Sequence, residues 1–85
     1  MDEGKRAGAV FAGVDTHKDA HALCVLDALG GKLAEGFFPA DAAGYDELAR
    51  AIGEPSGCAA VGVEGAASYG AGLARRLAEL GYPVV

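Results

Sequence analysis

Two short apolar runs of the chain share one pattern, in which small and β-branched residues are followed by Gly-Val and an acid. They are residues 10–15 and 59–64. Runs of this length that are rich in Val and bounded by turn residues are typical of strands buried on both faces. The pattern therefore predicts two buried strands, with Asp15 and Glu64 at their C-terminal ends.

Three further strands are predicted from the rest of the chain. Residues 20–26 would place apolar side chains on both faces of a strand. We therefore expect this strand to lie inside the sheet, with cover on both faces. Residues 27–31 end in paired glycines that favour a turn, and a third strand is expected over residues 32–38. Strands joined by such short turns form an antiparallel meander. A fifth strand is expected from Tyr82, after Gly81.

Two helices follow from apolar residues at helical spacing. The first is expected to begin at an N-cap Asp41 and end at Gly53. Its apolar face holds Tyr45, Leu48, Ala49 and Ile52. The second is expected to begin at an N-cap Ser68 and end at Gly81. Its apolar face holds Tyr69, Leu73, Leu77 and Leu80, with Arg75 and Arg76 on a solvated face.

The predicted order is β-β-β-α-β-α-β, an α/β fold in which the antiparallel three-strand meander is followed by parallel strands. Residues 9–85 are expected to form one domain after a flexible tail over residues 1–8. Because the sequence stops where a strand begins, we expect the domain to be partial and incomplete at its C-terminus.

Composition narrows the class of protein. The 85 residues allow one domain, and 52% of them are hydrophobic, which is typical of a globular chain. Many of these are alanine, so the core is expected to be thin. The net charge of −5 argues against a freestanding basic nucleic-acid binder. Cys24 and Cys58 do not have the spacing of zinc ligands, and they are interpreted as buried free thiols of a cytoplasmic protein. No apolar run is long enough to span a membrane.

The two acids are the first candidates for chemistry. In open α/β sheets the functional crevice lies outside the carboxyl ends of the strands, so Asp15 and Glu64 would converge if their strands are neighbours. Converging carboxylates repel unless a cation or a shared proton lies between them. Hard divalent cations such as Mg²⁺ prefer carboxylate oxygens, and two such ions can clamp the oxygens of a phosphodiester. Two acids would make half of such a site. Alternatively, Asp15 caps a turn and Glu64 is a solvated strand end.

Polar residues beside the acids are weaker candidates. His17 and Lys18 would contact phosphate or influence a metal site, or else belong to a solvated turn. Ser68 would contact phosphate at a helix N-terminus, or else be a plain N-cap. Tyr69 is interpreted as core and His21 as a half-buried strand histidine.

Two motifs carry a resemblance to a known family. Gly13–His21, followed by Val25–Asp27, and Gly62–Gly65 with Ser68–Gly70, resemble the opening of the DEDD transposases of bacterial insertion sequences. The N-terminal domain of that family is similar to the RuvC Holliday-junction resolvase. The resemblance covers about residues 10–85 and implies a ribonuclease-H-like fold.

The resemblance also implies a function. It assigns the first two of four metal-binding acids to Asp15 and Glu64, and the third and fourth have no counterpart in this sequence. It implies Mg²⁺- or Mn²⁺-dependent cleavage and transfer of DNA, guided in several members by a structured RNA, and we expect a homo-oligomer in a full-length protein. With half of the acids absent, the chain is expected to be inactive alone.

Three other interpretations stay open. The same acids and metal chemistry fit a fragment of a Holliday-junction resolvase-type nuclease. An actin-like ATP-dependent sugar or acetate kinase also opens with a strand that ends in Gly-x-Asp, although it prefers a smaller turn than Thr16-His17-Lys18. The chain would alternatively be an inert product of a truncated element.

Overall fold

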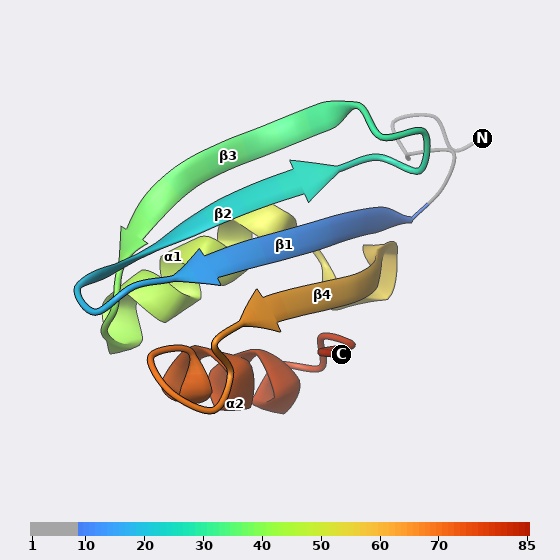
Figure 1. Ribbon diagram of the computed structural model, residues 1–85. Helices are drawn as coiled ribbons and strands as arrows, with labels where there is room; N and C mark the ends of the chain where they lie inside the picture. Colours follow the sequence, from blue (N-terminus) through green and yellow to red (C-terminus); the bar gives the residue numbers. More distant parts are fainter. Residues whose placement is uncertain (1–8) are drawn as a thin grey trace.

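The computed structural model describes residues 9–85. In it, two α-helices pack against a mixed four-stranded sheet (Figure 1). In chain order the elements are β1 Val10–Thr16, β2 Ala20–Leu26, β3 Lys32–Pro39, α1 Ala42–Ile52, the 3-10 turn η1 Pro55–Gly57, β4 Cys58–Glu64 and α2 Ala71–Glu79. The four predicted strands of the sheet are confirmed to within two residues at either end. The tail predicted over residues 1–8 lies outside the described residues.

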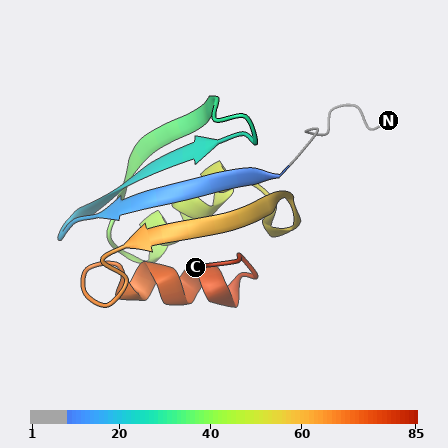
Figure 2. The same cartoon turned by 45° about the vertical axis from the view of Figure 1, so that its right-hand side comes forward.

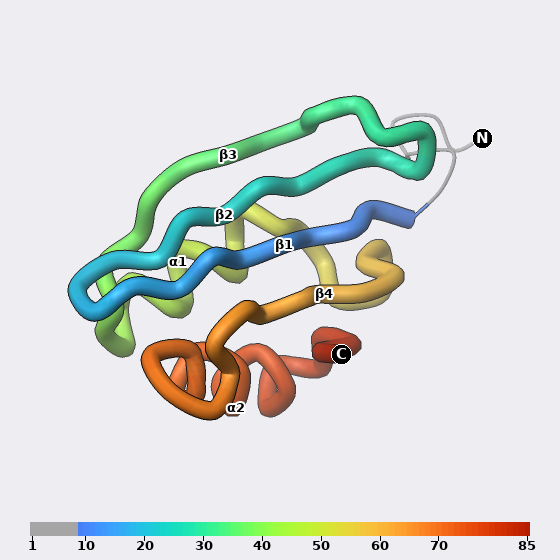
Figure 3. Tube along the Cα trace, in the orientation of Figure 1, coloured from blue at the N-terminus to red at the C-terminus, as the bar shows by residue number. Residues whose placement is uncertain are grey.

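The strands lie side by side in the order β3-β2-β1-β4. The path of the chain through these strands can be followed along the tube in Figure 3. β1, β2 and β3 pair antiparallel, so the predicted meander is confirmed. Asp27 stabilises the turn between β2 and β3, where its Oδ1 accepts from the amides of Leu29 at 2.9 Å and Gly31 at 2.8 Å. β4 returns parallel to β1, as expected for strands separated by a helical crossover. This mixed α/β arrangement is compatible with a ribonuclease-H-like fold.

Both helices cover the same face of the sheet (Figures 1 and 2). The residues that face them are buried and belong to alternate positions of the strands, as the pleat requires. From the sheet they are Val10, Ala12, Val14, His21, Leu23, Val25, Val61 and Val63, and from the helices Leu48, Ala49, Ile52, Leu73 and Leu77. The core is therefore a single layer between the sheet and two helices.

The other face of the sheet has no cover among residues 9–85, and we refer to it as the open face. Phe11, Leu33 and Phe37 are all exposed on it, Phe37 by 75%. The prediction that the strands are buried on both faces is therefore wrong for the part of the chain that the structure describes. The error arises because Gly13 and Gly62 lengthen the apolar pattern while offering little side-chain area to bury.

Helix α1 begins and ends where its sequence predicts. Asp41 is the N-cap, and its carboxylate accepts a hydrogen bond of 2.8 Å from the Gly44 amide. Gly53 follows the helix with φ of 101°, a conformation that favours glycine. Gly44 lies against the backbone of Pro39, so that a Cβ at this position would come within 1.9 Å of the Pro39 carbonyl oxygen. The absence of a side chain thus permits the close approach of α1 to the end of β3.

Helix α2 begins later than predicted. Its N-cap is Gly70, and the prediction that Ser68 is the N-cap is wrong. The amides of Ser68 and Gly70 both donate to the Gly65 carbonyl, at 2.9 and 2.8 Å, so residues 65–70 form turns before the helix starts. Tyr69 is consequently 58% exposed, against the prediction that it belongs to the core.

Several contacts tie the helices together and to the sheet. Arg76, expected on a solvated face, donates from Nε to Asp46 of α1 at 2.9 Å. Beyond α2, Val84 forms a parallel bridge with Val61, which is all that the described residues form of the predicted fifth strand. Tyr82 is buried, and its hydroxyl lies within hydrogen-bonding reach of the Ala49 carbonyl, at 3.0 Å, and of the Gly53 carbonyl.

The expectation for the two cysteines is met in part. Cys24 and Cys58 are free thiols, but only Cys58 is buried, and burial raises the pKa of its thiol. Neither helix within residues 9–85 is long and apolar enough to cross a membrane.

His21 is a buried polar residue in the core, not the half-buried strand histidine that we predicted. Its ring stacks on Tyr45 with 6.0 Å between the ring centroids. Its Nδ1 accepts from the His17 amide at 3.3 Å, and its Nε2 has no hydrogen-bond partner in residues 9–85. Burial lowers the pKa of His21 below its ordinary value of 6.5, and the nearby His17 lowers it further.

The buried His21 predicts a loss of stability in weakly acidic solution. The unfolded chain binds a proton at this residue near pH 6.5, whereas the folded chain binds it only at lower pH. The stability that neutral His21 contributes is therefore complete above pH 6.5 and is lost as the pH falls toward the lower pKa of the folded state. The loss is at most about 1.4 kcal/mol per pH unit. Urea titrations at about pH 7.5 and about pH 5.5 measure it.

The two histidines supply the matched control. His21→Phe keeps a ring against Tyr45 and should abolish this part of the pH dependence. His17→Gln removes an exposed imidazole and should leave most of the pH dependence in place, because burial is the largest cause of the lowered pKa of His21 and His17 a lesser one. An equal loss of stability in the wild-type chain and in His21→Phe would contradict the assignment.

Gly44 gives a second prediction. Alanine in place of glycine inside a helix usually stabilises it by about 1 kcal/mol. Here the Cβ would overlap the Pro39 carbonyl, so we expect Gly44→Ala to lower the free energy of unfolding by about 2 kcal/mol or more. Gly57→Ala is the control, because a Cβ at Gly57 meets nothing within 4 Å. Urea denaturation followed by circular dichroism compares the two, and a stabilised Gly44→Ala would show that the close contact is absent.

Candidate functional site

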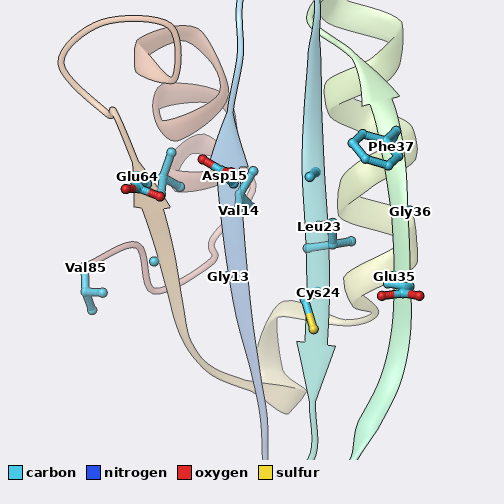
Figure 4. A pocket seen from close by; sticks show the side chains of 13 residues that line it. Gly13, Val14, Asp15, Leu23, Cys24, Glu35, Gly36, Phe37, Glu64 and Val85 are labelled. Carbon is cyan, nitrogen blue, oxygen red and sulfur yellow. The ribbon is translucent and has the colours of Figure 1, made fainter.

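Asp15 and Glu64 lie side by side at the carboxyl ends of β1 and β4. They are register partners in the parallel pairing, and both side chains project from the open face (Figure 4). The preceding residues, Val14 and Val63, are register partners as well and are buried against the helices. Because alternate residues of a strand face opposite sides, burial of the two valines places the two carboxylates together on the open side.

The acids lie at one end of a broad hollow in the open face, of about 960 Å³. Small residues, Gly13, Ala22 and Gly62, line it, and Phe37 and Val85 lie to either side (Figure 4). Because glycine has no side chain and alanine has only a methyl group, the backbone of the central strands is accessible from the open face.

The turn between β1 and β2 brings the imidazole of His17 to Asp15. The Nε2 atom of His17 lies 3.3 Å from Oδ2 of Asp15, and both side chains are more than half exposed. The next residue, Lys18, is also exposed in this turn. At this exposure an ion pair contributes little to folding, on the order of 0–1 kcal/mol.

The loop between β4 and α2 lies at the same end of the sheet and carries Ser68. This residue is exposed, and its hydroxyl donates to the Gly65 carbonyl at 3.3 Å. His17, Lys18 and Ser68 thus lie on two loops at the end of the sheet that carries the acids, and the ring of His17 lies beside Asp15. What the sequence suggested as a helix N-terminus is instead a turn whose carbonyl oxygen at Gly65 accepts several hydrogen bonds.

Thr16 connects the two loops and was not recognised from the sequence as part of the site. Its hydroxyl donates to the backbone carbonyl of Glu64 at 2.6 Å. A Cβ on Gly65 would come within 2.7 Å of the Thr16 hydroxyl oxygen, and one on Gly70 within 2.9 Å of the Thr16 methyl group. We refer to Thr16, Gly65 and Gly70 as the strand-end cluster. Thr16 and Glu64 are 48 residues apart, so no local pattern points to their contact.

Asp15 and Glu64 provide part of the ligand set that a hard divalent cation requires. Two neighbouring carboxylates on an accessible surface provide the oxygen ligands that Mg²⁺ or Mn²⁺ prefers, with water completing the coordination. Among residues 9–85, no group of three or more His, Cys, Asp or Glu side chains is placed to hold a metal ion. The described residues therefore offer half of a site and not a closed one.

In this mixed α/β sheet the paired acids lie at the carboxyl ends of adjacent parallel strands, which is where open α/β sheets bind their ligands. The particular family is shown by sequence comparison. The model of a transposase family, DEDD_Tnp_IS110, matches residues 12–85, and the chain belongs to this family. No curated protein matches the chain. The resemblance to DEDD transposases is thereby confirmed.

The exposed position of the acids predicts that they do not hold the fold together. Asp15→Ala and Glu64→Ala should leave the circular dichroism spectrum intact and change the free energy of unfolding by less than about 0.5 kcal/mol. Removal of one carboxylate relieves repulsion from the other, so any change should be toward higher stability. Val14→Ala, one residue away on the core face, should cost about 2 kcal/mol. Unfolding of either acid variant would show that the acids are structural.

Proposed function

We propose that this chain forms the N-terminal, ribonuclease-H-like (RuvC-like) part of a transposase that cleaves and transfers DNA strands in a metal-dependent reaction. Membership of the transposase family gives the role in transposition. The observation that carries the metal chemistry is the register of β1 and β4, which pairs Asp15 with Glu64 on the open face. Two like charges at adjacent positions are accounted for most simply by a cation that they share.

Asp15 and Glu64 would hold the cation, Mg²⁺ or Mn²⁺. When bound, a divalent cation supplies charge stabilisation to the attacking and leaving oxygens of a phosphodiester. The contribution of the chain is to hold the two carboxylates at a fixed separation on rigid strands. Most of the residues that line the hollow beside them are small or apolar, and Glu35 is the other acid among them.

Three residues around the acids are proposed to contact nucleic acid. Lys18 brings a positive charge close to the acids, His17 brings a ring nitrogen beside Asp15, and Ser68 adds a hydroxyl from the loop that follows β4. Phosphate contacts of this kind position a nucleic acid without reading its sequence. The expected ligand is DNA, and a structured RNA is a further partner that the family resemblance implies. We also propose that a full-length transposase acts as a homo-oligomer.

The chain alone is proposed to bind metal but not to cleave DNA. A two-metal site takes three or four acids, and residues 9–85 gather two. The net charge of −5 also disfavours tight binding to a polyanion. Further acids and basic surface would have to come from outside the described residues.

The family match favours the transposase over the two alternative enzymes. A resolvase-type nuclease would use the same acids, and nothing in the geometry of Asp15 and Glu64 separates the two. An actin-like kinase would need a phosphate-binding hairpin after β1. In this chain the turn instead places the bulky His17 side chain against Asp15, where a nucleotide phosphate would have to approach.

Titration of the ¹⁵N-labelled chain with MnCl₂ tests the proposal. Paramagnetic broadening should be strongest at the amides of Asp15 and Glu64, with an apparent Kd on the order of 1 mM for a two-carboxylate site. Mg²⁺ should compete with Mn²⁺ and reverse the broadening. Asp15→Asn and Glu64→Gln should each weaken binding about tenfold or more, because each removes half of the ligand set.

Glu35→Gln is the matched control, since Glu35 is an acid that lines the same hollow from β3. It should leave the Mn²⁺ affinity at Asp15 and Glu64 unchanged. Broadening spread evenly over all exposed carboxylates, or broadening at Asp15 that persists in Asp15→Asn, would refute a metal site at the strand ends. In the same buffers the wild-type chain should nick supercoiled DNA no faster than Asp15→Asn.

A further inference from the structure

We propose that Thr16 is the positioning residue of the acid pair, and that its hydroxyl sets the separation of the Asp15 and Glu64 carboxylates. This inference rests on the proposed function, because it concerns the same two carboxylates. Thr16 touches neither carboxylate. It acts on the backbone that carries them, because its hydroxyl donates to the Glu64 carbonyl at 2.6 Å from the residue that follows Asp15.

The hydrogen bond lies where the parallel ladder ends. The register partners of β1 and β4 run up to Asp15 and Glu64, and no further pair follows. Beyond this point β4 ends and its chain enters the loop before α2, whereas Thr16 still pairs with His21 of β2, so the end of β4 is the side of the ladder that is free to fray. A side-chain hydrogen bond from Thr16 across to Glu64 closes the ladder where backbone pairing stops.

The surroundings hold Thr16 in the orientation that this bond requires. A Cβ on Gly65 would lie 2.7 Å from the Thr16 oxygen, and a Cβ on Gly70 would lie 2.9 Å from its methyl group. Only glycine at both positions leaves room for the side chain to pack in the strand-end cluster. Gly65 also adopts φ of 76°, a conformation rare for other residues, and its carbonyl accepts from the amides of Ser68 and Gly70.

The chemistry of a shared ion explains why this separation matters. Oxygen ligands bind Mg²⁺ at about 2.0–2.1 Å and tolerate little deviation. Rotation of the Glu64 backbone would move its carboxylate relative to Asp15 even if both strands stayed folded. Residues that orient ligands in this indirect way typically change metal affinity by about 10- to 100-fold when they are replaced.

The test compares two substitutions in the 85-residue chain. Thr16→Val keeps the branched shape but lacks the donor, and Thr16→Ser keeps the donor but lacks the methyl group. We expect Thr16→Val to weaken Mn²⁺ binding at Asp15 and Glu64 about tenfold, and Thr16→Ser to bind within about twofold of the wild type. Broadening of the two amides by MnCl₂ measures both affinities.

A second readout needs no metal. The amides of Ser68 and Gly70 report on the loop that follows Glu64, since both donate to Gly65. Their hydrogen exchange should become about fivefold faster in Thr16→Val, as expected for the loss of one hydrogen bond, and stay near the wild-type rate in Thr16→Ser. Ser56→Ala is the control for removal of an exposed hydroxyl, at the opposite end of β4, and should change neither readout.

The outcomes separate this inference from the proposed function. Absence of specific broadening in the wild-type chain refutes the metal site itself. A wild type that binds Mn²⁺ and a folded Thr16→Val that binds it equally well refute the positioning role alone. Equal losses of affinity in Thr16→Val and Thr16→Ser also refute it, because the hydroxyl would then be irrelevant. If Thr16→Val fails to fold, the Mn²⁺ affinity of Thr16→Ser becomes the test. A folded Thr16→Ser that binds Mn²⁺ more weakly than the wild type overturns the inference.

Discussion

The parallel pairing of β1 with β4 is the constraint on which the rest of this structure depends. It joins segments separated by two strands and a helix, and it places Val14 beside Val63 and Asp15 beside Glu64. The valines are buried against the helices and contribute the free energy that holds the pairing together. The carboxylates contribute repulsion, so their proximity is maintained by the apolar residues beside them. Core packing on one side of the sheet thus maintains an electrostatically unfavourable arrangement on the other.

Features governed by neighbouring residues could be predicted from the sequence. Asp41 and Gly53 bound α1 because a carboxylate satisfies free amides at one end and glycine adopts positive φ at the other. The turn between β2 and β3 was predictable because paired glycines favour tight turns, and Asp27 adds hydrogen bonds to it. Their matching positions in two similar runs placed Asp15 and Glu64 at strand ends, but their adjacency stayed conditional on the two strands being neighbours, which the order of the sheet shows.

Features that depend on distant contacts could not be predicted. The hydrogen bond from Thr16 to the Glu64 carbonyl requires the register of β1 and β4, which no window of sequence contains. Ser68 has the chemistry of an N-cap, but the turn centred on Gly65 satisfies the local backbone first and delays the start of α2 to Ala71. The open face was missed because Gly13 and Gly62 were included in the apolar runs although they have no side chain to bury.

The long separation between the paired strands has a consequence for the order of folding. The meander of β1, β2 and β3 needs only short loops, whereas the contact between Thr16 and Glu64 closes a loop of 48 residues. Closing long loops is entropically costly and slow, so contacts between distant segments form late. A nascent chain can therefore assemble the hairpins as soon as they emerge from the ribosome, while the two carboxylates remain apart. The acid pair comes together only once β4 has been synthesised.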